Sequence, residues 1–149
     1  MPRLRTRTGS VVITAPANDN VPEWRLQAAA VRALRAHLDF GKRFALAGDM
    51  NAGRRGKQTA TIAKATGMTP GEPDLRVYSE QGRLLLVEYK TGAGRLSTAQ
   101  VDRHALLIRL GYTVHVVRAN TEAECAAETV RIVEEWLAHL APTIARTAA

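Results

Sequence analysis

The feature that most constrains the fold is an apolar, strand-like run that ends in charged residues. Residues 83–87 are largely apolar, with hydrophobic side chains at both odd and even positions, and Glu88, Tyr89 and Lys90 follow directly. Such a run predicts a central strand whose two faces are both covered. Because side chains two apart on a strand share a face, Glu88 and Lys90 are expected on one side and Tyr89 on the other. Charges rarely lie inside a sheet without partners, so this pair marks a candidate site.

The segment before this run predicts the other strand of a hairpin, and the turn length decides where Asp74 lies. A two-residue loop at 80–81 would turn Asp74 away from Glu88. A three-residue loop at 80–82, with its glycine in the left-handed conformation, would set Asp74 directly opposite Glu88. We expect the three-residue loop.

Two carboxylates in this position suit a divalent cation. Directly opposed residues have Cβ atoms roughly 5 Å apart, and carboxylates that close repel unless a positive charge separates them. Mg²⁺ or Mn²⁺, which prefer hard oxygen ligands, would supply that charge, and Lys90 would add another beside it. The alternative is a surface aspartate and a Glu–Lys pair without a role.

Length and composition indicate one core and a polyanionic partner. The chain has 149 residues, of which 46% are hydrophobic, which is enough for a single domain. Lysine and arginine number 21 against 14 acidic residues, giving a formal charge of +7. Such an excess favours DNA or RNA, although a merely soluble basic protein would show it too.

Cysteine content and hydropathy exclude several classes of protein. Cys125 is the only cysteine, which excludes an internal disulfide and a paired CxxC zinc site. No apolar run approaches the roughly 18 residues of a membrane span, and no apolar signal core follows the basic N-terminus. We therefore expect a cytoplasmic protein without a membrane segment or small-molecule cofactor.

The pattern of elements predicts one domain at residues 21–141 between two tails. Residues 1–20 alternate arginine with small and polar residues, which indicates a flexible basic tail, and residues 142–149 are expected to be disordered. Within the domain the order is α-β-α-β-β-α-β-α. Its expected parts are a helix from Pro22 toward Gly41, a strand at 42–47, a helix at 57–66, the hairpin, a helix at 98–110, a strand at 112–117 and a helix from Thr121.

Hydrophobic spacing also predicts which helix residues pack. The expected buried positions are Trp24, Gln27, Val31, Leu34 and Leu38 in the first helix, Val101, Ala105 and Ile108 in the third, and Val130, Val133, Trp136, Leu137 and Leu140 in the last. Glu23 lies four residues before Gln27 and so shares its face. Glu23 either stabilises the helix start or is a third acid aimed at the hairpin.

Other polar residues remain open to two interpretations. The sequence from Ser97 to Gln100 fits a capping box, so Gln100 is either structural or turned toward the site. Arginines on the glycine-bearing loop at 48–56 can approach a phosphate backbone, but a solvated loop would look the same. The four histidines show no ligand spacing, although His104 stands one turn from Gln100.

The ordered combination of these motifs resembles the VRR-NUC family, within the PD-(D/E)XK, restriction-endonuclease-like nucleases. The resemblance covers roughly residues 23–117. It rests on Gly-Glu-Pro-Asp at 71–74, the strand ending in Glu-Tyr-Lys at 88–90, Gly-Arg-Leu-Ser at 94–97 with Gln100, and Gly-Tyr-Thr-Val at 111–114. Glu72 departs from the family, which usually has a small or apolar residue there, and would add negative charge near the site.

The resemblance implies an α/β restriction-endonuclease-like fold, which is a mixed sheet flanked by helices. It also implies a catalytically active enzyme. Asp74, Glu88 and the Tyr89 carbonyl would hold Mg²⁺ or Mn²⁺, with Glu23 completing the acidic cluster. Lys90 would orient or activate the attacking water, and Gln100 would support the site. The residues expected to bind nucleic acid are Arg54, Arg55, Lys57 and Arg95.

The expected function is metal-dependent, structure-selective cleavage of branched DNA, as in Holliday-junction resolution. Small stand-alone members of the family are typical of phages and mobile elements, and cutting two strands implies a homodimer. The alternatives are a flap or general DNA endonuclease of the same fold, and a DNA-binding module without catalysis.

Overall fold

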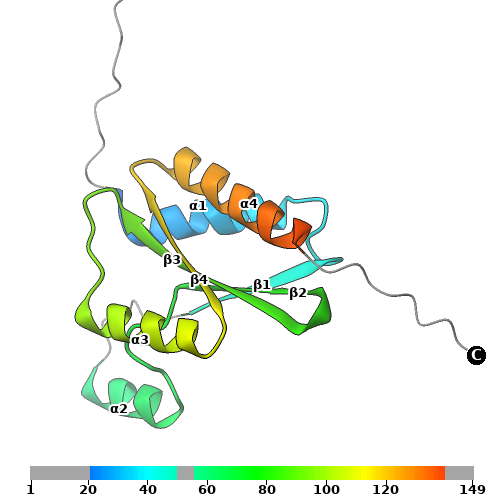
Figure 1. Cartoon of the computed structure of the whole chain (residues 1–149). Helices are drawn as coiled ribbons and strands as arrows, with labels where there is room; N and C mark the ends of the chain where they lie inside the picture. Colours follow the sequence, from blue (N-terminus) through cyan, green and yellow to red (C-terminus); the bar gives the residue numbers. More distant parts are fainter. Residues whose placement is uncertain (1–20, 50–55, 140–149) are drawn as a thin grey trace, which may run out of the picture.

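A four-stranded mixed sheet forms the centre of the protein (Figure 1). The computed structural model describes residues 21–49 and 56–139. The strands are β1 (Phe44–Gly48), β2 (Leu75–Ser79), β3 (Arg83–Thr91) and β4 (Thr113–Ala119), in the spatial order β1-β2-β3-β4. β1, β2 and β3 pair antiparallel, whereas β3 and β4 pair parallel.

Helices flank this sheet on both faces (Figure 1). α1 (Glu23–Arg35) and α4 (Glu122–Ala138) lie together over one face, and α3 (Thr98–Arg109) lies on the other. α2 (Lys57–Ala65) extends beyond α3 and has no buried residue. A mixed sheet flanked by helices, in the order α-β-α-β-β-α-β-α, confirms the predicted fold class.

The main core fills the space between the sheet and the pair α1 and α4. Alternate residues of β3 point into it, namely Leu85, Val87 and Tyr89, and they meet apolar residues of both helices. The alternate residues Leu86, Glu88 and Lys90 face the α3 side and are also buried. β3 is therefore the predicted central strand covered on both faces.

The hairpin has the predicted three-residue loop. Ser79 pairs with Arg83, and Glu80–Gly82 form the turn, with Gly82 at a φ of 67°. Gln81 also has a positive φ of 64°, which its sequence did not signal. This register, extended by one residue beyond the Leu75–Val87 pair, sets Asp74 opposite Glu88.

The predicted packing face of α1 was partly wrong. Trp24 is 65% exposed and Leu38 is 85% exposed, whereas Leu26, Ala29, Ala30 and Leu34 are buried. Leu38 lies beyond the end of the helix at Arg35, and Trp24 lies on the opposite side of the helix from Leu26. Small alanines, which a search for large apolar residues overlooks, form much of the real contact surface.

The predicted face of α3 was wrong as well. Val101 and Ile108 are 51% and 57% exposed, while His104 and Leu107 are buried. The spacing of apolar residues alone could not show this face, because a polar residue, His104, forms part of it. In α4 the expected Val133, Trp136 and Leu137 are buried and Val130 is partly buried, whereas Leu140 lies outside the described residues.

The tails predicted at 1–20 and 142–149 lie outside the described residues, so the domain boundaries stay predictions. In the part of the chain that is described, every helix is too short or too polar to cross a membrane.

Candidate active site

Asp74 and Glu88 come together where β2 begins, on the face of the sheet that α3 covers. The backbone N–H of Tyr89 donates to Asp74 Oδ2 at 2.9 Å, so the Asp74 side chain continues the hairpin's hydrogen bonding beyond the last residue pair. Glu88 is 1% exposed. The three-residue loop therefore has the expected consequence, because both acids lie on one face.

Burial and proximity both disfavour the charge on these acids. Burial, and to a smaller extent the negative charge of Asp74, raise the pKa of Glu88 to about 8, against the opposing positive charge of Lys90. Burial also raises the pKa of Asp74, against the hydrogen bond from Tyr89 and the charge of Lys90. Without a cation the pair favours holding a proton near neutral pH.

Lys90 links the sheet to the first helix. Its Nζ lies 3.1 Å from Glu23 Oε2 and 3.6 Å from Glu88 Oε1, and the residue is only 7% exposed. Gln27, one turn after Glu23, donates from Nε2 to the Asp74 carbonyl at 3.0 Å. The predicted shared face of Glu23 and Gln27 is correct, and it is turned toward the site.

Gln100 satisfies both of its interpretations at once. Its Oε1 accepts from the Ser97 backbone N–H at 2.9 Å, and Ser97 Oγ accepts from the Gln100 N–H at 3.2 Å, which completes the capping box. Its Nε2 donates to Glu88 Oε1 at 2.5 Å. A side-chain amide has a separate acceptor and donor, so the cap orients the donor toward Glu88.

His104 completes the wall of the site on the α3 side. Its Nε2 lies 3.6 Å from Glu88 Oε2, and among the described residues neither buried atom has a hydrogen-bond partner. Burial lowers the pKa of His104, which favours the neutral ring. Sequence reasoning noted only that His104 stands one turn from Gln100 and did not predict its burial.

The carboxylate oxygens of Asp74 and Glu88 are suitable donors for a divalent cation. Among the residues that the structure describes, Glu88 Oε2 is a buried carboxylate oxygen without a hydrogen-bond partner, an arrangement that costs free energy unless a cation or donor compensates it. Hard oxygen ligands from Asp74 and Glu88 fit Mg²⁺ or Mn²⁺. Within residues 21–49 and 56–139, no three or more His, Cys, Asp or Glu side chains form a ready ligand group. Glu23 faces Lys90, and its role as a ligand, like that of the Tyr89 carbonyl, stays a prediction.

The carboxylate of Glu72 is paired with arginines beside the acidic pair. It pairs with Arg103 Nε at 2.7 Å and with Arg76 Nη2 at 3.2 Å. Arg76 Nη2 also lies 3.7 Å from Asp49 Oδ2. Two arginines therefore offset the negative charge that the sequence predicted near Asp74 and Glu88.

The backbone conformation and the close packing at position 71 explain why the motif that ends at Asp74 begins with glycine. The φ of Gly71 is +80°, and a Cβ on it would meet the Ala99 carbonyl oxygen at only 2.2 Å. A side chain there would push the turn away from the start of α3. Close approach at Gly71 thus brings the segment leading to Asp74 beside the helix that carries Gln100 and His104.

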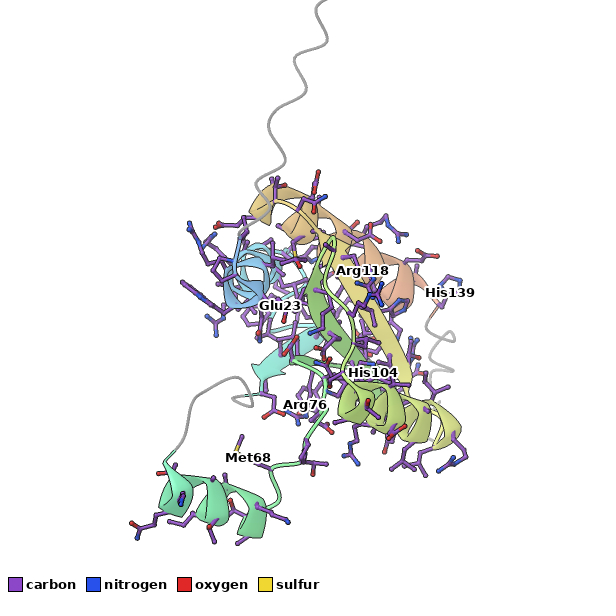
Figure 2. All side chains as sticks on the ribbon, turned by 90° about the vertical axis from the view of Figure 1, so that its left-hand side faces the viewer. Glu23, Met68, Arg76, His104, Arg118 and His139 are labelled. Atoms are coloured by element: carbon purple, nitrogen blue, oxygen red, sulfur yellow. The ribbon has the colours of Figure 1, made fainter. Side chains whose placement is uncertain are left out.

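The predicted nucleic-acid contacts are only partly described. Arg54 and Arg55 lie outside the described residues, and Lys57 is exposed at the start of α2. Arg95 is exposed on the loop between β3 and α3. Sequence reasoning missed Arg118, which holds this loop by donating to the Gly94 carbonyl. Figure 2 shows Glu23, Arg76 and His104, which come from three different elements, α1, β2 and α3.

Comparison with known proteins extends the result on the fold. Neither protein-family models nor curated proteins match the chain. A solved "VRR_NUC domain protein" is similar at a TM-score of 0.52 and 16% identity, over 78% of this chain and 88% of that one. A solved "VRR_NUC domain" is similar at a TM-score of 0.49 and 21% identity, over 76% and 96% of the two chains. The protein therefore has the fold of a VRR_NUC domain, as its motifs predicted.

Proposed function

We propose that this protein is a VRR-NUC-family endonuclease that uses Mg²⁺ or Mn²⁺ to hydrolyse phosphodiester bonds in DNA. The observation that carries the proposal is the buried Glu88 with the partly exposed Asp74 opposite it and the buried Lys90 beside it. Burying charged groups lowers the stability of the fold, so their presence indicates a function. Carboxylates with a shifted pKa beside a buried lysine are typical of catalytic sites. The VRR_NUC fold supports the same assignment.

Asp74, Glu88 and the Tyr89 carbonyl would hold the cation. A bound Mg²⁺ or Mn²⁺ supplies an acidified water and offsets negative charge at the phosphate in the transition state. Lys90 places its amine between Glu23 and Glu88, where it can donate to the oxygen of the attacking water. Gln100 orients Glu88 through its hydrogen bond, and His104 lies against the other carboxylate oxygen from the α3 side and would limit its movement.

We further propose branched DNA as the preferred substrate, cut by a homodimer. The formal charge of +7 supports a nucleic-acid substrate, and paired cuts in two strands suit a twofold assembly. A flap or general endonuclease would keep the same site and differ only in the DNA structure that it cuts. Comparing a four-way junction, a flap and a linear duplex separates these two activities.

A DNA-binding module without catalysis is the alternative from another class. Such a module would need the basic residues and would not need the acids. Asp74→Ala and Lys90→Ala should abolish cleavage in Mg²⁺ or Mn²⁺ while leaving salt-dependent DNA binding in place. Asp102→Ala, an exposed acid on α3, is the matched control and should cleave normally. Unchanged cleavage by the Asp74 variant, or no cleavage by the wild type on any substrate, would reject the nuclease.

A further inference from the structure

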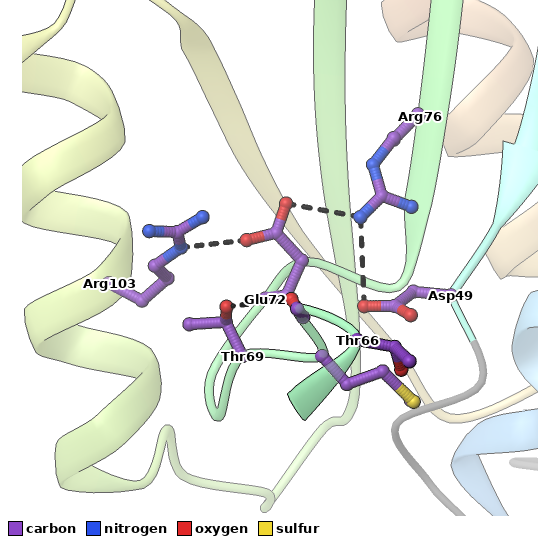
Figure 3. Close-up of a pocket in the computed structure, with 8 residues that line it drawn as sticks. Asp49, Thr66, Thr69, Glu72, Arg76 and Arg103 are labelled. Atoms are coloured by element: carbon purple, nitrogen blue, oxygen red, sulfur yellow. Dashed lines mark hydrogen bonds and ion pairs between the residues drawn. The ribbon is translucent and has the colours of Figure 1, made fainter. Parts of the chain in front are cut away.

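We propose that a cavity beside the active site binds a second phosphate of the same DNA strand, next to the phosphate that is cleaved. The proposal rests on the proposed function and names a subsite of it. The cavity has a volume of about 230 Å³ and lies between β2, α3 and the segment at 66–69 (Figure 3). Arg76 and Arg103 line it from two sides, with Glu72 between them.

The two guanidinium groups have donors to spare. Glu72 receives Nε of Arg103 at 2.7 Å and Nη2 of Arg76 at 3.2 Å. Each guanidinium carries five N–H donors in a planar fork, and the contacts with Glu72, and of Arg76 with Asp49, use one nitrogen of each among the described residues. Both arginine side chains are 27% exposed, so a ligand in the cavity can reach them. Paired arginines of this kind suit the oxygens of a phosphate.

The position of the cavity matches the spacing of a nucleic-acid strand. Arg76 follows Asp74 by two residues on β2, which places it on the same face about 7 Å along the strand. Arg103 follows Gln100 by three residues, so it lies about one turn farther along α3 on the same side. A strand whose scissile phosphate lies at Asp74 and Glu88 would bring the neighbouring phosphate to these arginines.

Replacing Glu72 should change the DNA affinity in a direction that can be measured. Glu72 holds the two arginines together, but its negative charge lies between them and repels a phosphate in the cavity. Neutralising it leaves two arginines and one carboxylate, that of Asp49, at the cavity, so the lining becomes net positive and attracts DNA. Glu72→Gln is therefore expected to bind DNA roughly tenfold more tightly. If the cluster only joined β2 to α3, the substitution would lower stability without tightening binding.

A methylphosphonate scan locates the subsite. Each linkage of a DNA strand is replaced in turn by an uncharged methylphosphonate, and the affinity is measured by fluorescence anisotropy in EDTA. The methylphosphonate should lower the DNA affinity of the wild type roughly tenfold at one linkage next to the cleaved one. At that linkage it should not lower the affinity of Arg103→Met any further. Arg109→Met, which removes an exposed charge in the last turn of the same helix, should keep the wild-type pattern.

The outcomes separate the subsite from the nuclease. Absence of any linkage whose effect disappears in Arg103→Met would overturn the subsite, and so would a folded Glu72→Gln variant with unchanged or weaker affinity. Should Arg103→Met fail to fold, the affinity of Glu72→Gln decides. Because binding is measured without metal, a coupled linkage in a protein that never cleaves DNA would support the subsite and reject the nuclease.

Discussion

Replacing Glu88 by glutamine should change how the stability of the metal-free protein depends on pH. The pKa of Glu88 is raised from 4.5 to about 8 by burial and by Asp74. A raised pKa favours the folded state below the unfolded value of 4.5, and this contribution is lost as the pH rises through 8. Between pH 5 and 8 the loss amounts to roughly 3 kcal/mol, or about 10 °C in Tm for a chain of this length.

Glutamine resembles the protonated carboxyl in shape, and it can keep the hydrogen bond from Gln100. The variant should therefore lack this pH dependence and be more stable than the wild type at pH 8 in EDTA. Urea unfolding of both proteins at pH 5, 6, 7 and 8 measures the difference, which cancels titration elsewhere in the chain. Parallel curves for the two proteins would show that Glu88 stays ionised in the fold and would refute the reasoning.

Three further predictions concern the surroundings of the site. Mg²⁺ should raise the Tm of the wild type more at pH 8 than at pH 6, because the proposed ligand is ionised Glu88, and equal shifts would contradict this role. His104→Phe should lower cleavage by roughly 10- to 100-fold with the fold intact, measured as kcat beside a circular dichroism control; full activity would exclude a role in orienting Glu88. Gly71→Ala should cost more than about 2 kcal/mol in urea unfolding, whereas Gly67→Ala, with a φ of +95° and open space around it, should cost only about 1; equal losses would show that contact with α3 is unimportant.

The hairpin could be predicted from the sequence because local rules govern it. Gly82 favours the left-handed turn position, the loop length sets the register, and the register sets Asp74 opposite Glu88. The same holds for the face shared by Glu23 and Gln27, which follows from helical spacing. These relations connect residues that are close in sequence, so a periodic pattern is sufficient.

The rest of the site depends on packing between distant elements. His104 is buried because α3 lies against the sheet beside Glu88, and nothing in the α3 sequence alone shows which of its faces is covered. Glu72 pairs with Arg103, which lies 31 residues later in the chain, so the sequence could not show that the charge of Glu72 is offset. Trp24 misled the prediction for α1 because size suggested burial, while Ala30 makes the close contact.

The central claim is that Asp74 and Glu88 together hold a divalent cation, and direct Mn²⁺ binding tests it best. Electron paramagnetic resonance at pH 8 measures free Mn²⁺ during titration of the wild type, Asp74→Asn, and the exposed control Asp102→Asn. We predict binding by the wild type and the control, and at least roughly tenfold weaker binding by Asp74→Asn. Equal binding by all three proteins, or none by the wild type, would contradict the claim.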